Sequence, residues 1–266
     1  MSHIHTKILI FILIFASTFV EAKNISAYYD AVYTPAKVIK SNLKRSGFKV
    51  LATYSPAKKS YLQVIVFTNK SLKKMSSKKI RGFAAIQRIL VDTKNNTVRV
   101  TNPSYWLHAF LQKDFDSSQA SSIKKSLSRA LGKLQATKDI LDTNELKKYH
   151  YAFSMPYYED MLELKKGSDL LKKINKKKKL FQVKLSNGST LVGVKMSKNS
   201  EKFIESIGED KALLLPYTIL IENGTAYALH AKYYLAISYP LLSLGQFMKI
   251  SSAPDAIERK LKKVFK

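Results

Sequence analysis

The sequence predicts an α+β protein built from two tandem, similar domains, and three features of the chain support this prediction. Two segments, 89–100 and 219–228, have the pattern of β-hairpins, because apolar β-branched runs flank a turn rich in Asn and Gly. An aromatic pair and a leucine follow each hairpin, at 105–107 and 233–235. Each half then ends in a basic amphipathic helix. This agreement in order and offset predicts one domain plan used twice.

The elements before the first hairpin follow from periodicity and turn residues. We expect a strand at 25–33, a helix at 35–46, and two further strands at 48–54 and 61–67. Gly47 suits the position after the helix, where a left-handed backbone conformation is common.

The second half repeats this order. The expected elements are a strand at 149–157, a helix at 163–174, strands at 180–185 and 190–196, and a short helix at 200–207. Asn187 and Gly188 mark a tight turn between the last two strands. The polar stretch 135–148 would connect the halves. We therefore predict a first domain at 23–143 and a second at 144–266.

The closing helices have apolar side chains at helical spacing. These are Ile123, Leu127, Ala130 and Leu134 in the first half, and Ile257, Leu261, Val264 and Phe265 in the second. Together with the hairpins, they predict for each domain a mixed or largely antiparallel sheet covered on one face by helices.

The first 22 residues have the organisation of an export signal. A short polar stretch ends at Lys7, an apolar run extends to Val20, and Ala22 suits signal-peptidase cleavage. The apolar run has about 13 residues, fewer than the roughly 20 that a spanning helix needs. The sequence thus predicts a Sec-type signal cleaved after Ala22 and a periplasmic or secreted protein without a transmembrane anchor.

Composition excludes some chemistry and favours some partners. The chain has no cysteine, which excludes disulfides, thiolate catalysis and cysteine metal sites. Its formal net charge of +27 favours anionic partners. Only 6 of the 46 basic residues are arginine, however, and planar recognition of phosphates or bases favours arginine. Nucleic acid is therefore a disfavoured partner, and a solubilising basic surface is the alternative interpretation.

The first half resembles the domain-of-unknown-function family 302. The segments that carry the resemblance are 46–50, 66–69, 89–100 and 102–107, the last reading Asn-Pro-Ser-Tyr-Trp-Leu. The second half resembles a more divergent copy through Leu-Leu-Pro-Tyr at 214–217. It has Ala-Lys in place of the Asn-Pro pair, and Tyr217 where some members have cysteine. The resemblance implies a compact α/β sandwich that pairs with another copy, here as an internal pseudo-dimer. It implies no reaction.

No pattern of catalytic or metal-binding residues stands out. The three histidines after the signal lack ligand spacing, and no nucleophile elbow or phosphate-binding glycine loop occurs. We therefore expect neither a metal nor a cofactor, and the sequence favours a non-catalytic protein. The segments after the two hairpins are the candidate rim of a ligand pocket. The binding candidates are Tyr217, His230, Tyr233, Asn102 and Tyr105.

The densest run of charge contains six lysines within eight residues. They are Lys172, Lys173, Lys176, Lys177, Lys178 and Lys179. Expected at the end of a helix, they suit either a solvated surface or an anionic envelope surface.

Three functions remain open at this point. The leading hypothesis is an exported non-catalytic protein that binds a small ligand or a protein through a tandem-domain pseudo-dimer. The alternative is a peripheral factor held at a membrane or envelope surface by lysine electrostatics. A weaker alternative is an enzyme with a site between the halves, around Tyr217 and His230.

Overall fold

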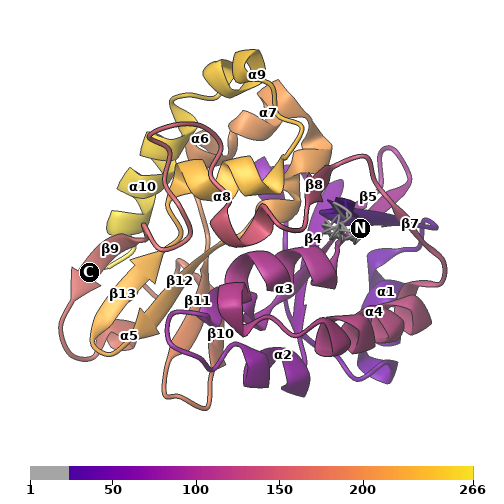
Figure 1. Ribbon diagram of the computed structural model, residues 1–266, viewed down its shortest axis with the longest axis horizontal. Coiled ribbons are helices and arrows are strands. Elements are labelled where there is room, and N and C mark those ends of the chain that lie inside the picture. The colour runs from indigo at the N-terminus through magenta and orange to yellow at the C-terminus, as the bar shows by residue number, and fades with distance from the viewer. Residues whose placement is uncertain (1–23, 266) are drawn as a thin grey trace, which may run out of the picture.

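A computed structural model describes residues 24–265 of the chain. The predicted signal peptide at 1–22, with its cleavage after Ala22, lies outside these residues. The described chain is a mixed α+β structure with two large sheets, a small two-stranded sheet and helices around them (Figure 1). All strand pairs are antiparallel.

The first large sheet has the strand order β3-β4-β5-β6-β2-β7. Its strands are β2 (Tyr28–Ala31), β3 (Lys49–Tyr54), β4 (Leu62–Thr68), β5 (Gln87–Asp92), β6 (Thr97–Thr101) and β7 (Leu134–Ala136). The helices of this part are α1 (Ala36–Arg45), α2 (Lys70–Met75), α3 (Pro103–Leu111) and α4 (Ser117–Leu131), with 3-10 turns η1 (Pro56–Lys58), η2 (Gly82–Ala85) and η3 (Gln112–Asp114). The predicted strands and hairpin of this region are confirmed, and so are its helices, with one correction. Leu134, expected on the apolar stripe of the closing helix, lies beyond the end of α4 and begins β7, because Gly132 ends the helix with a positive φ.

The second large sheet has the order β10-β11-β12-β13-β9. Its strands are β9 (Leu162–Lys166), β10 (Lys179–Lys184), β11 (Thr190–Val194), β12 (Tyr217–Glu222) and β13 (Thr225–Ala228). The other elements are η4 (Leu146–Lys148), α5 (Leu170–Lys173), α6 (Lys198–Glu201), α7 (Phe203–Ile207), η5 (Glu209–Leu214), α8 (Ala231–Ser238), α9 (Leu244–Lys249) and α10 (Ala253–Lys262).

The start of the second half differs from the prediction. Residues 149–157 form no strand, and β9 takes that place in the sheet by pairing with β13. The predicted helix at 163–174 shrinks to α5, because Gly167 and Asp169 both adopt positive φ, which interrupts a right-handed helix. Tyr149 within this segment and Tyr158 just after it are buried without belonging to a strand.

The predicted connector at 135–148 is also more structured than expected. β7 pairs with β2, and β8 (Ile140–Asp142) pairs with β1 (Asn24–Ser26). Its polar composition is that of sheet-edge strands, whose outer backbone groups and side chains face water.

Short segments from one part of the chain cover the sheet of the other part. All six residues of β5 are buried, so both faces of the first sheet are covered at this strand. The segment η5 packs against β5 and β6, while η2 packs against β11 and β12. A Cβ atom at Gly82 would overlap with the side chain of Leu220, so any larger residue there would have to displace Leu220. The predicted coverage by helices on one face alone is therefore incomplete.

Candidate functional site

The tyrosines predicted as binding residues lie in the protein interior. Tyr105, Tyr217 and Tyr233 are buried, and so is Asn102. The three tyrosines belong to an aromatic cluster at the contact between the two sheet regions, where the rings of Trp106 and Tyr234 meet edge to face. None of these four side chains lines a cavity described below.

Tyrosine hydroxyls close the C-terminal end of α8. The Tyr105 hydroxyl donates to the Ile237 carbonyl at 2.7 Å, and the Tyr28 hydroxyl donates to the Ser238 carbonyl at 2.7 Å. A third hydroxyl, from Tyr149, donates to the Ala236 carbonyl at 3.1 Å. The last carbonyls of a helix have no partner within the helix, and this end of α8 is buried. The place of Tyr105 is thus structural.

Asn102 and His230 occupy equivalent places as N-caps. The Asn102 side chain accepts from the Ser104 N–H at 3.0 Å at the start of α3. Nδ1 of His230 accepts from the Lys232 N–H at 3.3 Å at the start of α8, and Nε2 lies 3.5 Å from Oε1 of Glu258. Burial lowers the pKa of His230, while Glu258 opposes this shift. Both residues fix helix starts.

The Tyr217 and Tyr233 hydroxyls have no hydrogen-bond partner within residues 24–265. Burial raises the pKa of each well above 10.0, which keeps both phenols neutral. The Tyr217 ring packs edge to face on Tyr234 with centroids 5.1 Å apart. A neutral, enclosed Tyr217 and a capping His230 are not arranged as an acid and base around a shared cavity.

The predicted lysine run lies on the surface from α5 to the start of β10. Lys172 pairs with Asp169 at 2.9 Å. Lys260 of α10 lies close to Lys178, and its pKa is lowered by burial and then by this like charge. α5 has only four residues, so the lysine charges lack the stabilisation by the dipole of a long helix that the sequence had predicted. None of the six lysines lines a cavity described here.

A different set of lysines lines an open groove of about 770 Å³. We call it the lysine groove, and its lining comprises Lys70, Lys73, Lys74, Ser77, Lys184, Leu185, Ser186 and Gly188. One wall is α2 and the other is the turn between β10 and β11, which come from different halves of the chain. Figure 1 shows α2 beside this turn at the bottom of the molecule.

Local structure presents these lysines to the groove. The Asn69 side chain caps α2 by accepting from the Leu72 N–H at 2.8 Å, and Leu72 is buried against the core. Lys70, Lys73 and Lys74 are spaced as i, i+3 and i+4, which places them on neighbouring positions of one helix surface.

The hydroxyl of Ser77 connects the two walls of the groove. Ser77 Oγ donates to the Lys73 carbonyl at 2.7 Å and accepts from the Ser186 N–H at 3.1 Å. Lys184 is exposed because its neighbours in the sequence, Val183 and Leu185, turn into the core.

The groove has cations without compensating anions. No carboxylate lines it, and none of its four lysines forms an ion pair within the described part of the chain. Like charges around one groove repel each other, and an anion bound there would relieve this repulsion. The sequence contains a signal for it, five lysines within residues 70–79. The opposite wall comes from over a hundred residues away along the chain, which local pattern cannot indicate.

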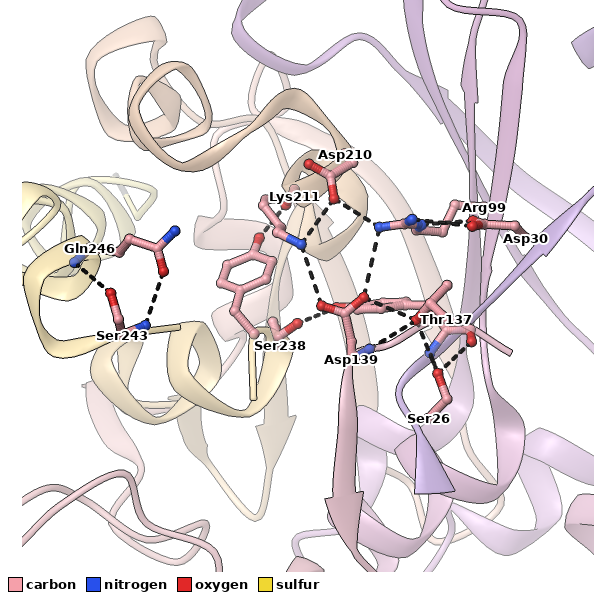
Figure 2. A network of polar contacts seen from close by, with 12 residues as sticks. Ser26, Asp30, Arg99, Thr137, Asp139, Asp210, Lys211, Ser238, Ser243 and Gln246 are labelled. Atoms are coloured by element: carbon pink, nitrogen blue, oxygen red, sulfur yellow. Dashed lines mark hydrogen bonds and ion pairs between the residues drawn. The ribbon is translucent and has the colours of Figure 1, made fainter. Parts of the chain in front are cut away.

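The second polar region between the halves is internally neutralised (Figure 2). Arg99 pairs with Asp30 and with Asp210, each at 2.8 Å. Lys211 pairs with Asp210 at 2.9 Å and with Asp139 at 3.4 Å. A cavity of about 500 Å³ adjoins Arg99. Because its cations and carboxylates pair with each other, this network joins the halves and leaves less free charge for a ligand.

Residues 24–265 contain no group of three or more side chains suited to hold a metal ion, and no helix among them is long and apolar enough to cross a membrane. No family model, curated protein or solved structure matches the chain. The resemblance to the domain-of-unknown-function family 302 therefore stays a prediction.

Proposed function

We propose that this chain is an exported, non-catalytic binding protein made of two copies of one domain, and that it binds an anionic ligand in the lysine groove between them. The observation that carries the proposal is a set of four lysines, contributed by both copies to one groove, that form no ion pair with any residue in 24–265. A small or medium-sized ligand fits a groove of about 770 Å³.

The strand orders support a tandem of similar domains. β3-β4-β5-β6-β2 in one sheet and β10-β11-β12-β13-β9 in the other follow the same connection pattern along the chain. In both, a 3-10 segment precedes the hairpin and packs on the other sheet. A pseudo-dimer with domains at 23–143 and 144–266, as the resemblance to family 302 implies, accounts for this reciprocal packing of each 3-10 segment on the other domain's sheet.

The experiment compares two variants of equal charge. The groove variant replaces Lys70, Lys73, Lys74 and Lys184 with Gln, and the control variant replaces Lys172, Lys173, Lys176 and Lys177 with Gln. Binding of tripolyphosphate is measured by calorimetry at low salt. We expect the groove variant to bind at least tenfold more weakly, about 1.4 kcal/mol, and the control to stay within about threefold of the parent. Equal losses in both variants would contradict a local site.

The second candidate function is a peripheral factor at an anionic envelope surface, held by the run Lys172–Lys179. The proximity of Lys178 to Lys260 favours it, because like charges gathered at one place increase the local positive potential. Under this alternative, the control variant would lose more affinity for anionic vesicles than the groove variant, and high salt would abolish binding of the parent.

A further inference from the structure

Three large apolar side chains protrude around the short helix α9. Leu241, Leu244 and Met248 are 56%, 68% and 62% exposed, and no residue of α9 is buried. We call these three residues the apolar tip. Figure 1 draws α9 at the top of the molecule and α2 at the bottom, so the tip lies far from the lysine groove.

The segment that carries the tip is held in place by its surroundings. Ser243 and Gln246 form a reciprocal capping box at the start of α9. The Tyr151 ring stacks on Phe247 with centroids 5.1 Å apart, and its hydroxyl donates to the Leu242 carbonyl at 2.9 Å. Two residues after Tyr151, Phe153 is 96% exposed. The apolar side chains therefore project from an ordered base.

We propose that the apolar tip inserts into the interfacial layer of an anionic lipid bilayer. The charge of the chain complements such a surface, since its formal net charge is +27 and the exposed Lys249 ends α9. Lys202 adds a further positive charge at the start of α7, which packs on α9. The negative charge of Glu205, also on α7, is partly offset by Lys59, whose Nζ lies 3.8 Å from Oε1 of Glu205. A small group of apolar side chains on a short helix is enough for insertion into the interfacial layer. A stable protein interface needs roughly 20 to 30 residues a side, more than the tip provides.

This inference does not depend on the proposed function, and a tryptophan probe tests it. The only tryptophan, Trp106, is buried, so Leu244→Trp adds an exposed reporter. We expect its emission to shift to the blue with vesicles of phosphatidylcholine and phosphatidylglycerol, and to stay unchanged with phosphatidylcholine alone. The shift should persist when the groove lysines are replaced with Gln. No shift with anionic vesicles overturns the proposal.

Co-sedimentation with the same vesicles gives a matched comparison. The tip variant replaces Leu241, Leu244 and Met248 with Ser. The control variant replaces three other exposed apolar residues with Ser, namely Val32, Val38 and Ile140. We expect at least a tenfold lower partition coefficient for the tip variant and less than a twofold change for the control. Equal partition of both variants overturns the proposal. The proposal is also overturned if the parent and the control are dimers in solution while the tip variant is a monomer, because the tip would then bind a second copy of the chain.

Discussion

Two junctions between the halves occupy equivalent places in the chain but differ in charge and closure. In one, α2 of the first half faces the β10–β11 turn of the second, and this is the lysine groove. In the other, α6 of the second half contacts η1, in the β3–β4 connection of the first. The second junction is closed by carboxylates. We call it the glutamate clamp, formed by Glu201, Glu205 and Glu209.

The clamp satisfies its own polar and charged groups, in contrast to the lysine groove. Oε2 of Glu201 accepts from the Ala57 N–H at 2.6 Å, and Oε1 accepts from the Tyr54 hydroxyl. Lys59 lies 3.0 Å from Glu209 and 3.8 Å from Glu205. One junction thus satisfies its polar groups internally, as a structural contact requires. The other keeps its cations available, as a binding site requires.

Breaking the clamp should give the largest effect on stability. Glu201→Ala leaves the buried Ala57 N–H and Tyr54 hydroxyl without their acceptor, and we expect a loss of about 3 kcal/mol in the free energy of unfolding. Urea denaturation measures this change. Glu163→Ala removes only the exposed pair with Lys166 and should cost less than about 0.5 kcal/mol. Similar losses in the two variants would show that the clamp is not structural.

The tyrosine contacts between the two halves should give an intermediate effect. Tyr105→Phe removes the hydroxyl that caps the Ile237 carbonyl, and we expect a loss of about 1 to 2 kcal/mol. Tyr217→Phe is the matched control, because the Tyr217 hydroxyl has no partner within the described chain; it should change stability by less than about 0.5 kcal/mol. Thermal unfolding of both variants checks the difference, and the opposite order would exclude this explanation of Tyr105.

The pH dependence of the clamp should give the smallest effect. Burial raises the pKa of Glu201 above 4.5, although its hydrogen bonds with Tyr54 and Ala57 oppose the shift. The folded state therefore holds this proton more tightly than the unfolded state. The stabilisation from Glu201 is present below pH 4.5 and is lost as pH rises through the folded pKa.

The neutral variant Glu201→Gln separates this proton from other titrations. Urea denaturation between pH 4 and 7 should show a smaller decline of stability with rising pH for Glu201→Gln than for the parent. Parallel pH profiles would mean that Glu201 has the same pKa in the folded and unfolded states.

Local pattern was sufficient for much of the fold. The Asn-Gly turn at Asn223 and Gly224 predicted the β12–β13 hairpin, and the apolar spacing of Ile257 and Leu261 predicted α10. Val264 and Phe265, expected on the same stripe, follow the end of α10 at Lys262, and Phe265 forms a β-bridge with Ile174. Both signals involve residues within a few positions of each other. β7 and β8 lack such a signal, because they are strands only through pairing with residues far along the chain.

The candidate site was harder to predict for the same reason. The run Lys172–Lys179 was the denser charge pattern, but it does not line the lysine groove. Lys184 lines it together with α2, and the Ser186 N–H donates to Ser77 across the two walls. Tyr105 and Tyr217 are aromatic because they fill the contact between the halves, and sequence alone cannot distinguish such tyrosines from those of a ligand pocket.

The tyrosine-capped end of α8 has a consequence for cooperativity. Its final carbonyls belong to the second half, but two of the hydroxyls that satisfy them, from Tyr28 and Tyr105, belong to the first. A separated second half would leave these carbonyls exposed to water or unpaired, so its intrinsic stability would be lower than its share of the intact chain. The two halves are therefore thermodynamically coupled, and they should unfold together in a single transition.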